Sequence, residues 1–175
     1  MKRLILWLPL GIFLLFVALV AFGLNRPGES TIRSQMIGKA VPEFTLPAAL
    51  AGRPGLASRD LATGAPRIVN IFASWCVPCI AEAPQLMALK RQGIPVDAIA
   101  IRDRPEDIAA FLAKYDDPYE RIGLDADSRV QLALGSSGVP ETFVIDGKGI
   151  IRHQVIGGIG PQQLRELVAA YEAAR

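Results

Sequence analysis

The only two cysteines of the chain, Cys76 and Cys79, are three positions apart and follow a near-continuous apolar run at 68–73. The residues after Cys79 have helical spacing, so the pattern predicts a buried strand leading into a helix with Cys76 at its N-terminus. Unpaired N–H groups and the helix dipole favour a thiolate there. We therefore expect thiol–disulfide exchange, with Cys76 as the attacking sulfur and Cys79 as the resolving sulfur.

The same spacing could also form half of a zinc site, a static disulfide or no site at all. Zinc needs four ligands, whereas the sequence offers no third cysteine and a single histidine, His153, to which we assign no role. Haem attachment needs a histidine after the second cysteine, where Ile80 stands. A structural disulfide closing so short a loop adds little stability. The strand-to-helix context favours redox use of the pair.

A proton must leave Cys79 during exchange, and Glu82, one helical turn further on, is the best acid–base candidate in the sequence. Alternatively, Glu82 is a solvated carboxylate, which the helix dipole favours in the first turn of a helix. Pro78 has no N–H, so it removes one potential donor to the Cys76 thiolate and favours a reducing pair. Alternatively, Val77 and Pro78 are ordinary loop residues.

Trp75, Val77 and Pro78 are expected to belong to the rim that contacts the partner. A large amphipathic ring such as Trp75 beside an exposed sulfur is a typical contact residue. Core packing is the alternative.

The N-terminus predicts a membrane anchor. Residues 4–24 carry no charge and are almost wholly apolar, and Lys2 and Arg3 precede them. These 21 residues would span roughly 31 Å as a helix, which matches a bilayer core. The basic flank keeps the start cytoplasmic and exports the remainder. A cleaved signal peptide is the alternative, although its apolar core would be unusually long. We expect an anchor at 1–24, a flexible stalk at 25–39 and one domain at 40–175.

The formal net charge is +2, and Lys2 and Arg3 account for it, so the exported part is neutral. Because its positive and negative charges balance, the exported part has no basic face to which nucleic acid could bind. Two cysteines in an oxidising compartment would normally stay a disulfide. A reductant there needs a supply of electrons, which indicates a partner in the same membrane.

The periodicity predicts an α/β domain with a mixed sheet covered on both faces. Pro84 should kink the helix that follows the cysteines. Ser58 is a candidate cap for one helical turn that ends near Leu61. The expected strands are 41–47, 56–57, 68–73, 94–101, 121–124, 142–145 and 150–156. The expected longer helices follow Cys79, Pro105 and Pro161, and a short helix is expected from Ser128 to Leu134.

The run from Val69 to Cys79 with Pro84, the loop Gly138-Val139-Pro140, and a late hairpin and terminal helix resemble the thioredoxin fold. The phrases IGKAVPEFTLP and GVPETFVIDGKGII are similar to the membrane-anchored, periplasmic thiol-disulfide proteins of cytochrome c maturation, the DsbE/CcmG type. The resemblance extends over residues 37–174 and the anchor. It implies a thioredoxin fold with an extra N-terminal β-hairpin behind one transmembrane helix.

The resemblance also implies the reaction. Such proteins sit in the bacterial inner membrane and use no cofactor other than their redox-active disulfide. A membrane thiol reductase keeps them reduced, and they pass electrons to the oxidised CxxCH cysteines of apocytochrome c or to a haem-ligation thiol carrier. Similar anchored reductases serve other envelope clients such as copper sites, and a docking module without electron transfer is a further alternative.

Several site residues follow from the same resemblance. It implies a cis Pro140 that faces the disulfide and an acidic residue at Glu82. Asn70 replaces the buried aspartate of ordinary thioredoxins, which removes the usual base. Val139 and Pro140 are expected to form the lip opposite Trp75, where an extended partner backbone could pair. Glu141 would lie beside the disulfide, either setting specificity or acting as an ordinary surface charge.

Overall fold

The computed structural model describes residues 7, 9, 11–17, 19–20 and 36–175. The chain divides into two units, Met1–Arg33 and Ser34–Arg175. The described residues of the first unit are helical. Within the described part of the chain, no helix combines the length and apolar character needed to cross a membrane. The rest of the expected anchor, and residues 25–35 of the expected stalk, lie outside the described residues.

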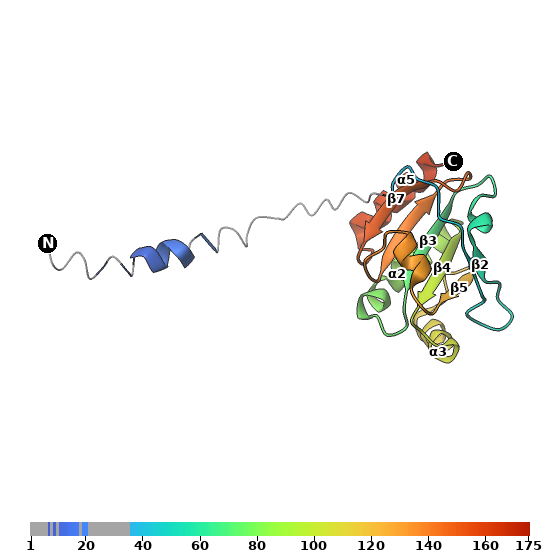
Figure 1. Cartoon of the computed structure of the whole chain (residues 1–175), viewed down its shortest axis with the longest axis horizontal. Helices are drawn as coiled ribbons and strands as arrows, with labels where there is room; N and C mark the ends of the chain where they lie inside the picture. Colours follow the sequence, from blue (N-terminus) through green and yellow to red (C-terminus); the bar gives the residue numbers. More distant parts are fainter. Residues whose placement is uncertain (1–6, 8, 10, 18, 21–35) are drawn as a thin grey trace. The chain divides into compact units, whose positions relative to one another are not determined.

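The centre of the second unit is a five-stranded mixed sheet with the order β5-β4-β3-β6-β7. Neighbours β3, β4 and β5 are parallel, whereas β6 and β7 are antiparallel to the strands they join. The predicted mixed sheet is confirmed (Figure 1). The strands are β3 (Arg67–Phe72), β4 (Val96–Ile101), β5 (Ile122–Asp125), β6 (Glu141–Ile145) and β7 (Ile151–Ile156).

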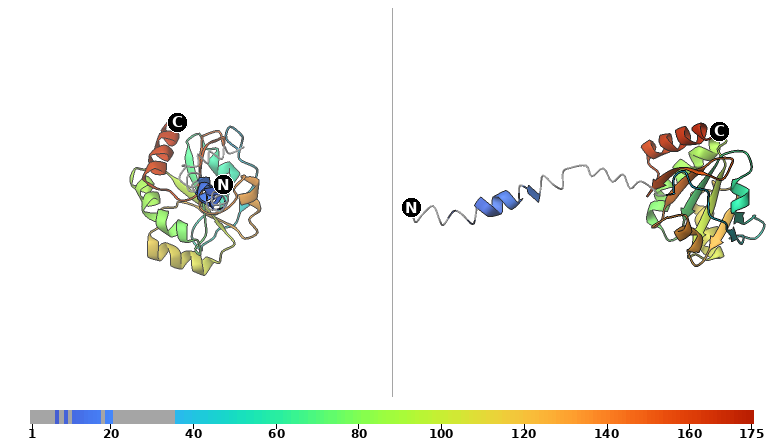
Figure 2. Two further views of the ribbon diagram at one scale, coloured as in Figure 1. Left: turned by 90° about the vertical axis from the view of Figure 1, so that its left-hand side faces the viewer. Right: turned by 45° about the horizontal axis from the view of Figure 1, so that its top comes forward.

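Three helices cover one face of this sheet: α2 (Val77–Arg91), α3 (Pro105–Tyr115) and α5 (Pro161–Ala173). The crossovers β3–α2–β4 and β4–α3–β5 step across the sheet in the same direction. Right-handed crossovers that step in the same direction place their helices on the same face. Helix α5 packs against α2 and against β6 and β7. The three helices lie side by side in the left view of Figure 2.

The opposite face is covered by a small hairpin and two short helices (Figure 2, left). The elements are β1 (Thr45–Leu46), β2 (Leu56–Ala57), η1 (Ser58–Leu61) and α4 (Arg129–Ala133). The hairpin contacts β4 and β5. A Cβ at Gly123 would come within 2.8 Å of the Leu46 side chain, so glycine permits this close approach. The predicted N-terminal hairpin and two-sided cover are confirmed.

The N-terminal segment of the domain differs from expectation in detail. The strand expected at 41–47 is reduced to Thr45–Leu46, with single bridges at Ala40 and Ala48. Pro42 and Pro47 bound this short strand, and neither can donate to a ladder. Ser58 does not cap η1, because Ala57 occupies the cap position.

Residues 36–39, which we expected in the stalk, hydrogen bond to the domain. Gly38 N donates to the Ile151 carbonyl at 2.8 Å, and Ile151 N donates to the Lys39 carbonyl at 2.9 Å.

Helix α2 buries one face along its whole length. Pro78 occupies its first turn, and the helix continues through Pro84 to Arg91. The kink expected at Pro84 stays a prediction. The buried residues follow the i, i+3, i+4, i+7 spacing of one helix face. They are Cys79, Glu82, Ala83, Leu86 and Leu89. Cys79 and Glu82 therefore both point into the domain.

Candidate functional site

The two cysteines form a disulfide where β3 gives way to α2. Cys76 is the N-cap of α2, and its Sγ accepts a hydrogen bond from Cys79 N at 3.2 Å. The two Cα atoms are 5.3 Å apart. The predicted placement of Cys76 at a helix N-terminus is confirmed. There the helix N–H groups stabilise a thiolate once the bond is reduced.

The residues beside the disulfide form an exposed rim. Trp75 is 57% exposed, Val77 is 74% exposed, and Pro78 is also exposed. Trp75 Nε1 donates to the Arg102 carbonyl at 3.2 Å, which fixes the indole in this position. Core packing of Trp75, the alternative weighed from the sequence, is therefore wrong. An exposed, oriented indole beside a reactive sulfur is suited to contact a partner.

The loop after β4 holds this rim, and no feature of the sequence indicated this contact. Asp103 accepts from Ser74 N at 2.6 Å and from Ser74 Oγ at 2.8 Å. The neighbouring Arg102 has a φ of 46° and donates from Nε to Ser128 Oγ at 3.0 Å. The turn before Cys76 is thus fixed by a loop 27 to 29 residues further along the chain.

Val139 and Pro140 lie at the same end of the sheet as the disulfide. Strand β6 begins at Glu141, opposite Ile71 of β3, and β3 leads into the cysteine segment. The Val139–Pro140 peptide bond is cis, as the resemblance implied. The Pro140 carbonyl accepts from Gly157 N at 2.9 Å. Three loops therefore meet at this end: residues 73–76, 136–140 and 157–160.

Glu141 is 1% exposed, so the interpretation as an ordinary surface charge is wrong. Its Oε1 accepts from Ser137 N at 2.8 Å and from Gly138 N at 3.3 Å. Its Oε2 accepts from Gln154 Nε2. The carboxylate is used inside the protein, where it holds the loop that precedes Pro140.

We predict that Glu141→Ala and Glu141→Gln differ in stability. Alanine leaves the Ser137 and Gly138 N–H groups without their acceptor, which should lower the free energy of unfolding by about 2–3 kcal/mol. Glutamine keeps an acceptor, and Gln154 Oε1, which has no partner, can turn to accept from the new amide. We expect a loss below about 1 kcal/mol for glutamine. Urea unfolding measures both, and equal losses would contradict the anchoring role.

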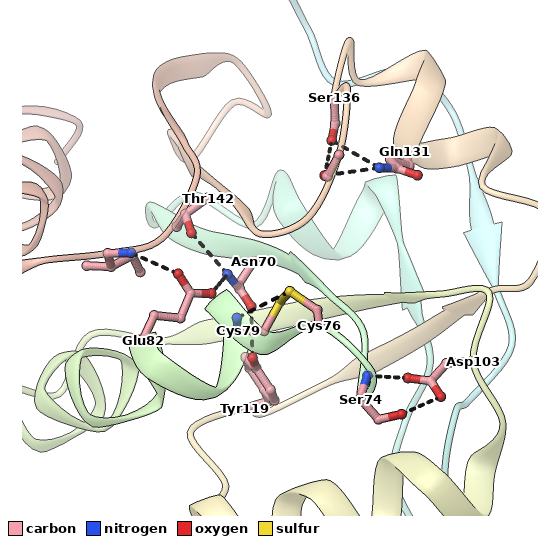
Figure 3. Close-up of a disulfide and its surroundings, with 12 residues drawn as sticks. Asn70, Ser74, Cys76, Cys79, Glu82, Asp103, Tyr119, Gln131, Ser136 and Thr142 are labelled. Carbon is pink, nitrogen blue, oxygen red and sulfur yellow. Dashed lines mark hydrogen bonds between the residues drawn. A yellow bond between two sulfur atoms is a disulfide. The ribbon is translucent and has the colours of Figure 1, made fainter.

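Glu82 lies beside the disulfide in a buried polar network (Figure 3). It is 1% exposed, so the alternative of a solvated carboxylate is wrong. Its Oε1 accepts from Asn70 Nδ2 at 3.0 Å, and its Oε2 accepts from Ile159 N at 3.0 Å. Burial raises the pKa of Glu82 from 4.5 to about 7, although both hydrogen bonds oppose the rise. A carboxyl group with this pKa can accept and return a proton near neutral pH.

Asn70 is the hub of this network. It lies in the middle of β3 and is fully buried. Besides bonding Glu82, its Nδ2 donates to Thr142 Oγ1 at 3.0 Å, and its Oδ1 accepts from the Tyr119 hydroxyl at 2.8 Å. The asparagine that removes the usual thioredoxin base therefore orients a different carboxyl group. Tyr119 and Thr142 were missed from the sequence, although a polar Asn70 within an apolar run was a signal that partners exist.

The raised pKa of Glu82 predicts a pH-dependent stability. The folded protein binds the Glu82 proton more tightly than the unfolded chain does, so this contribution is complete below pH 4.5 and is lost as pH rises through about 7. The loss should amount to about 3 kcal/mol. Glu82→Gln removes the titration, so the difference in unfolding free energy between variant and wild type should change by this amount from pH 4 to 8. A constant difference across this range would contradict the burial argument.

No group of three or more potential metal ligands occurs among the described residues. His153 lies in β7, away from the segment that carries the cysteines.

Comparisons with known proteins agree with this geometry. The Redoxin family model matches residues 36–170. The chain is 38% identical to thiol:disulfide interchange protein DsbE of Pseudomonas aeruginosa, over 97% of this chain and 93% of that protein. It is 35% identical to thiol:disulfide interchange protein HelX of Rhodobacter capsulatus, over 90% and 89% of the two chains.

A solved structure shows the same fold. A secreted Mycobacterium tuberculosis disulfide oxidoreductase, homologous to Escherichia coli DsbE, is similar with a TM-score of 0.62 at 22% identity. The match extends over 75% of this chain and 96% of that chain. At this identity the likeness supports the thioredoxin fold alone.

Proposed function

The chain belongs to the Redoxin family, as a thiol–disulfide oxidoreductase of the DsbE type, and we propose that it reduces the CxxCH disulfide of apocytochrome c. The observation that carries the proposal is the cysteine pair at the N-terminus of α2, with an exposed rim above it and a buried carboxyl group below. The pair itself supplies the electrons, so the reaction needs no other cofactor in this protein.

The reaction proceeds in two exchanges. The Cys76 thiolate attacks one sulfur of the client disulfide, so that a Cys76–client bond forms and the other client sulfur leaves as a thiolate. Cys79 then attacks Cys76, and the client departs with two reduced cysteines. Glu82 takes the proton that Cys79 must lose, and Trp75, Val77 and the Val139–Pro140 segment contact the client. The product form of the protein is the disulfide that the structure contains.

The setting is also part of the proposal. The apolar stretch at 4–24 with Lys2 and Arg3 before it supports a single-pass anchor in a bacterial inner membrane, with the domain in the periplasm. A membrane thiol reductase returns electrons to the Cys76–Cys79 pair. Anchoring both proteins in one membrane raises their effective concentration.

Deletion of the gene in its host tests the client. We expect loss of covalently haem-bound c-type cytochromes and recovery when a dithiol is added to the medium. The wild-type chain should restore the cytochromes in the deletion strain, and the Cys76→Ser, Cys79→Ser double variant should not. Normal cytochrome levels after deletion would overturn the apocytochrome assignment in favour of another envelope client. Full restoration by the double variant would favour a docking role.

A further inference from the structure

Tyr119 stands at the far end of a buried chain of hydrogen bonds that reaches Glu82. The residue comes from the connection between α3 and β5, 49 positions after Asn70 in the sequence. Its hydroxyl is 2.8 Å from Asn70 Oδ1, and Asn70 Nδ2 is 3.0 Å from Glu82 Oε1. Tyr119 is 5% exposed, and Asn70 and Glu82 are more deeply buried. Figure 3 shows Asn70 between Glu82 and Tyr119, beside the disulfide.

The orientation of the Asn70 amide decides whether Glu82 faces an N–H donor or a carbonyl acceptor. An ionised carboxylate only accepts hydrogen bonds, so it is satisfied when Nδ2 faces it. A protonated carboxyl group can instead donate to Oδ1 if the amide is turned over. The Tyr119 hydroxyl donates to Oδ1 and thereby holds this atom away from Glu82. Burial raises the pKa of Tyr119 well above 10, so its hydroxyl keeps its proton throughout the working pH range.

We propose that Tyr119 is a positioning residue of the exchange reaction, acting through Asn70 to keep an N–H donor on Glu82 and so to hold that carboxylate ready for the Cys79 proton. The inference rests on the proposed role of Glu82 as the base. It gives the α3–β5 connection a part in the chemistry, although this segment lies far from the cysteines in sequence.

The tyrosine ring and the tyrosine hydroxyl have separable roles. The ring stacks on Phe72 with centroids 5.1 Å apart, and phenylalanine preserves this packing. Tyr119→Phe removes only the hydroxyl and leaves Oδ1 of a fully buried amide without its donor. The amide can then turn so that Oδ1 faces Glu82 and Thr142, where it accepts from the protonated carboxyl group and from the Thr142 hydroxyl. The pKa of Glu82 should therefore rise.

The surroundings of Glu82 allow a rise in its pKa to be attributed to the Asn70 amide. The causes of its shifted pKa are burial, the Asn70 amide and the Ile159 N–H from the loop before α5. Tyr119 experiences the charges of both Glu82 and Asp117, and Cys79 lies one helical turn before Glu82 on the same buried face. In the oxidised protein neither sulfur titrates, so Glu82 can be followed alone.

Carbon-13 NMR of the side-chain carboxyl groups in the oxidised protein measures the Glu82 midpoint, with Glu82→Gln identifying the signal. We expect Tyr119→Phe to raise the midpoint by about 0.5–1 pH unit. Reduction of a synthetic disulfide peptide by the reduced protein should be about three- to fivefold slower at pH 6.5 and equal to wild type above about pH 8.5. Tyr171→Phe is the matched control, because Tyr171 is also 5% exposed and lies in α5.

An unchanged Glu82 midpoint in Tyr119→Phe would overturn the inference, as would the same shift in Tyr171→Phe. If Tyr119→Phe fails to fold, Thr142→Val tests the same amide, because Thr142 Oγ1 accepts the second Nδ2 hydrogen. It should also raise the midpoint. The two proposals can fail separately. If Tyr119→Phe moves the Glu82 midpoint but Glu82→Gln exchanges at the wild-type rate, then Tyr119 positions Glu82 and Glu82 is not the base.

Discussion

Cys79→Ser is expected to accumulate a mixed disulfide between Cys76 and the client while turnover stops. Cys76 is only 4% exposed, against 2% for Cys79, but it is the helix N-cap, and the exposed Trp75 and Val77 flank it. The N–H groups of the first turn favour a thiolate at this position, so Cys76 is the sulfur that should attack a client docked on the rim. Cys79 lies on the buried face of α2 and serves to release the client. Serine cannot attack the mixed disulfide, so multiple-turnover reduction should fall by at least about a thousandfold. Non-reducing electrophoresis and mass spectrometry of the intact adduct measure the trapped species.

Cys76→Ser is the matched control, since it removes the other sulfur and changes the side-chain volume by the same amount. It should form no adduct, because the remaining thiol at Cys79 lies on the inner face of α2 and lacks the N-cap position that favours a thiolate. An adduct through Cys79 in this variant, with none through Cys76 in Cys79→Ser, would reverse the order of attack. The same trap in living cells identifies the direct client, whether apocytochrome c or a thiol carrier.

The elements that position the cysteines were predictable because local signals agree. An apolar run followed by Cys76 and a Pro78 in the first helical turn predicts a strand that leads into a helix. The turn at 146–149 between two β-branched segments likewise predicted the hairpin of β6 and β7. Even the burial of Glu82 had a signal, because it shares i, i+3 and i+4 spacing with Cys79 and Ala83.

The contacts that fix the site were not predictable, because they join segments that are remote in sequence. Asp103 meets Ser74 across 29 positions, and Tyr119 meets Asn70 across 49. Asp103, Ser74 and Tyr119 come from irregular segments, where no periodicity indicates which way a side chain points. Glu141 shows the same limit: it is next to Pro140 in sequence, yet its carboxylate turns inward, where it also accepts from Gln154, 13 positions further on.

Glu82→Gln should slow the release of the client by about a hundredfold at pH 7, the usual contribution of a positioned general base. Its geometry suits this role, because Glu82 lies one turn after Cys79 on the same buried face. Burial raises its pKa to about 7, so at neutral pH a large fraction is ionised and able to accept a proton. Glutamine preserves the size of the side chain and can still accept from Asn70 or Ile159, so the fold should be retained. Stopped-flow decay of the preformed mixed disulfide measures the rate.

The pH dependence separates base catalysis from a structural effect. In the wild type the release rate should rise with pH through about 7, as Glu82 loses its proton. In Glu82→Gln this step should disappear, and the rate should rise only where Cys79 ionises on its own. The two curves then converge at alkaline pH, because a thiolate that is already formed needs no base. Equal rates from about pH 6 to 8 would remove Glu82 from the mechanism, and parallel curves would indicate that glutamine disturbs the site without removing a base.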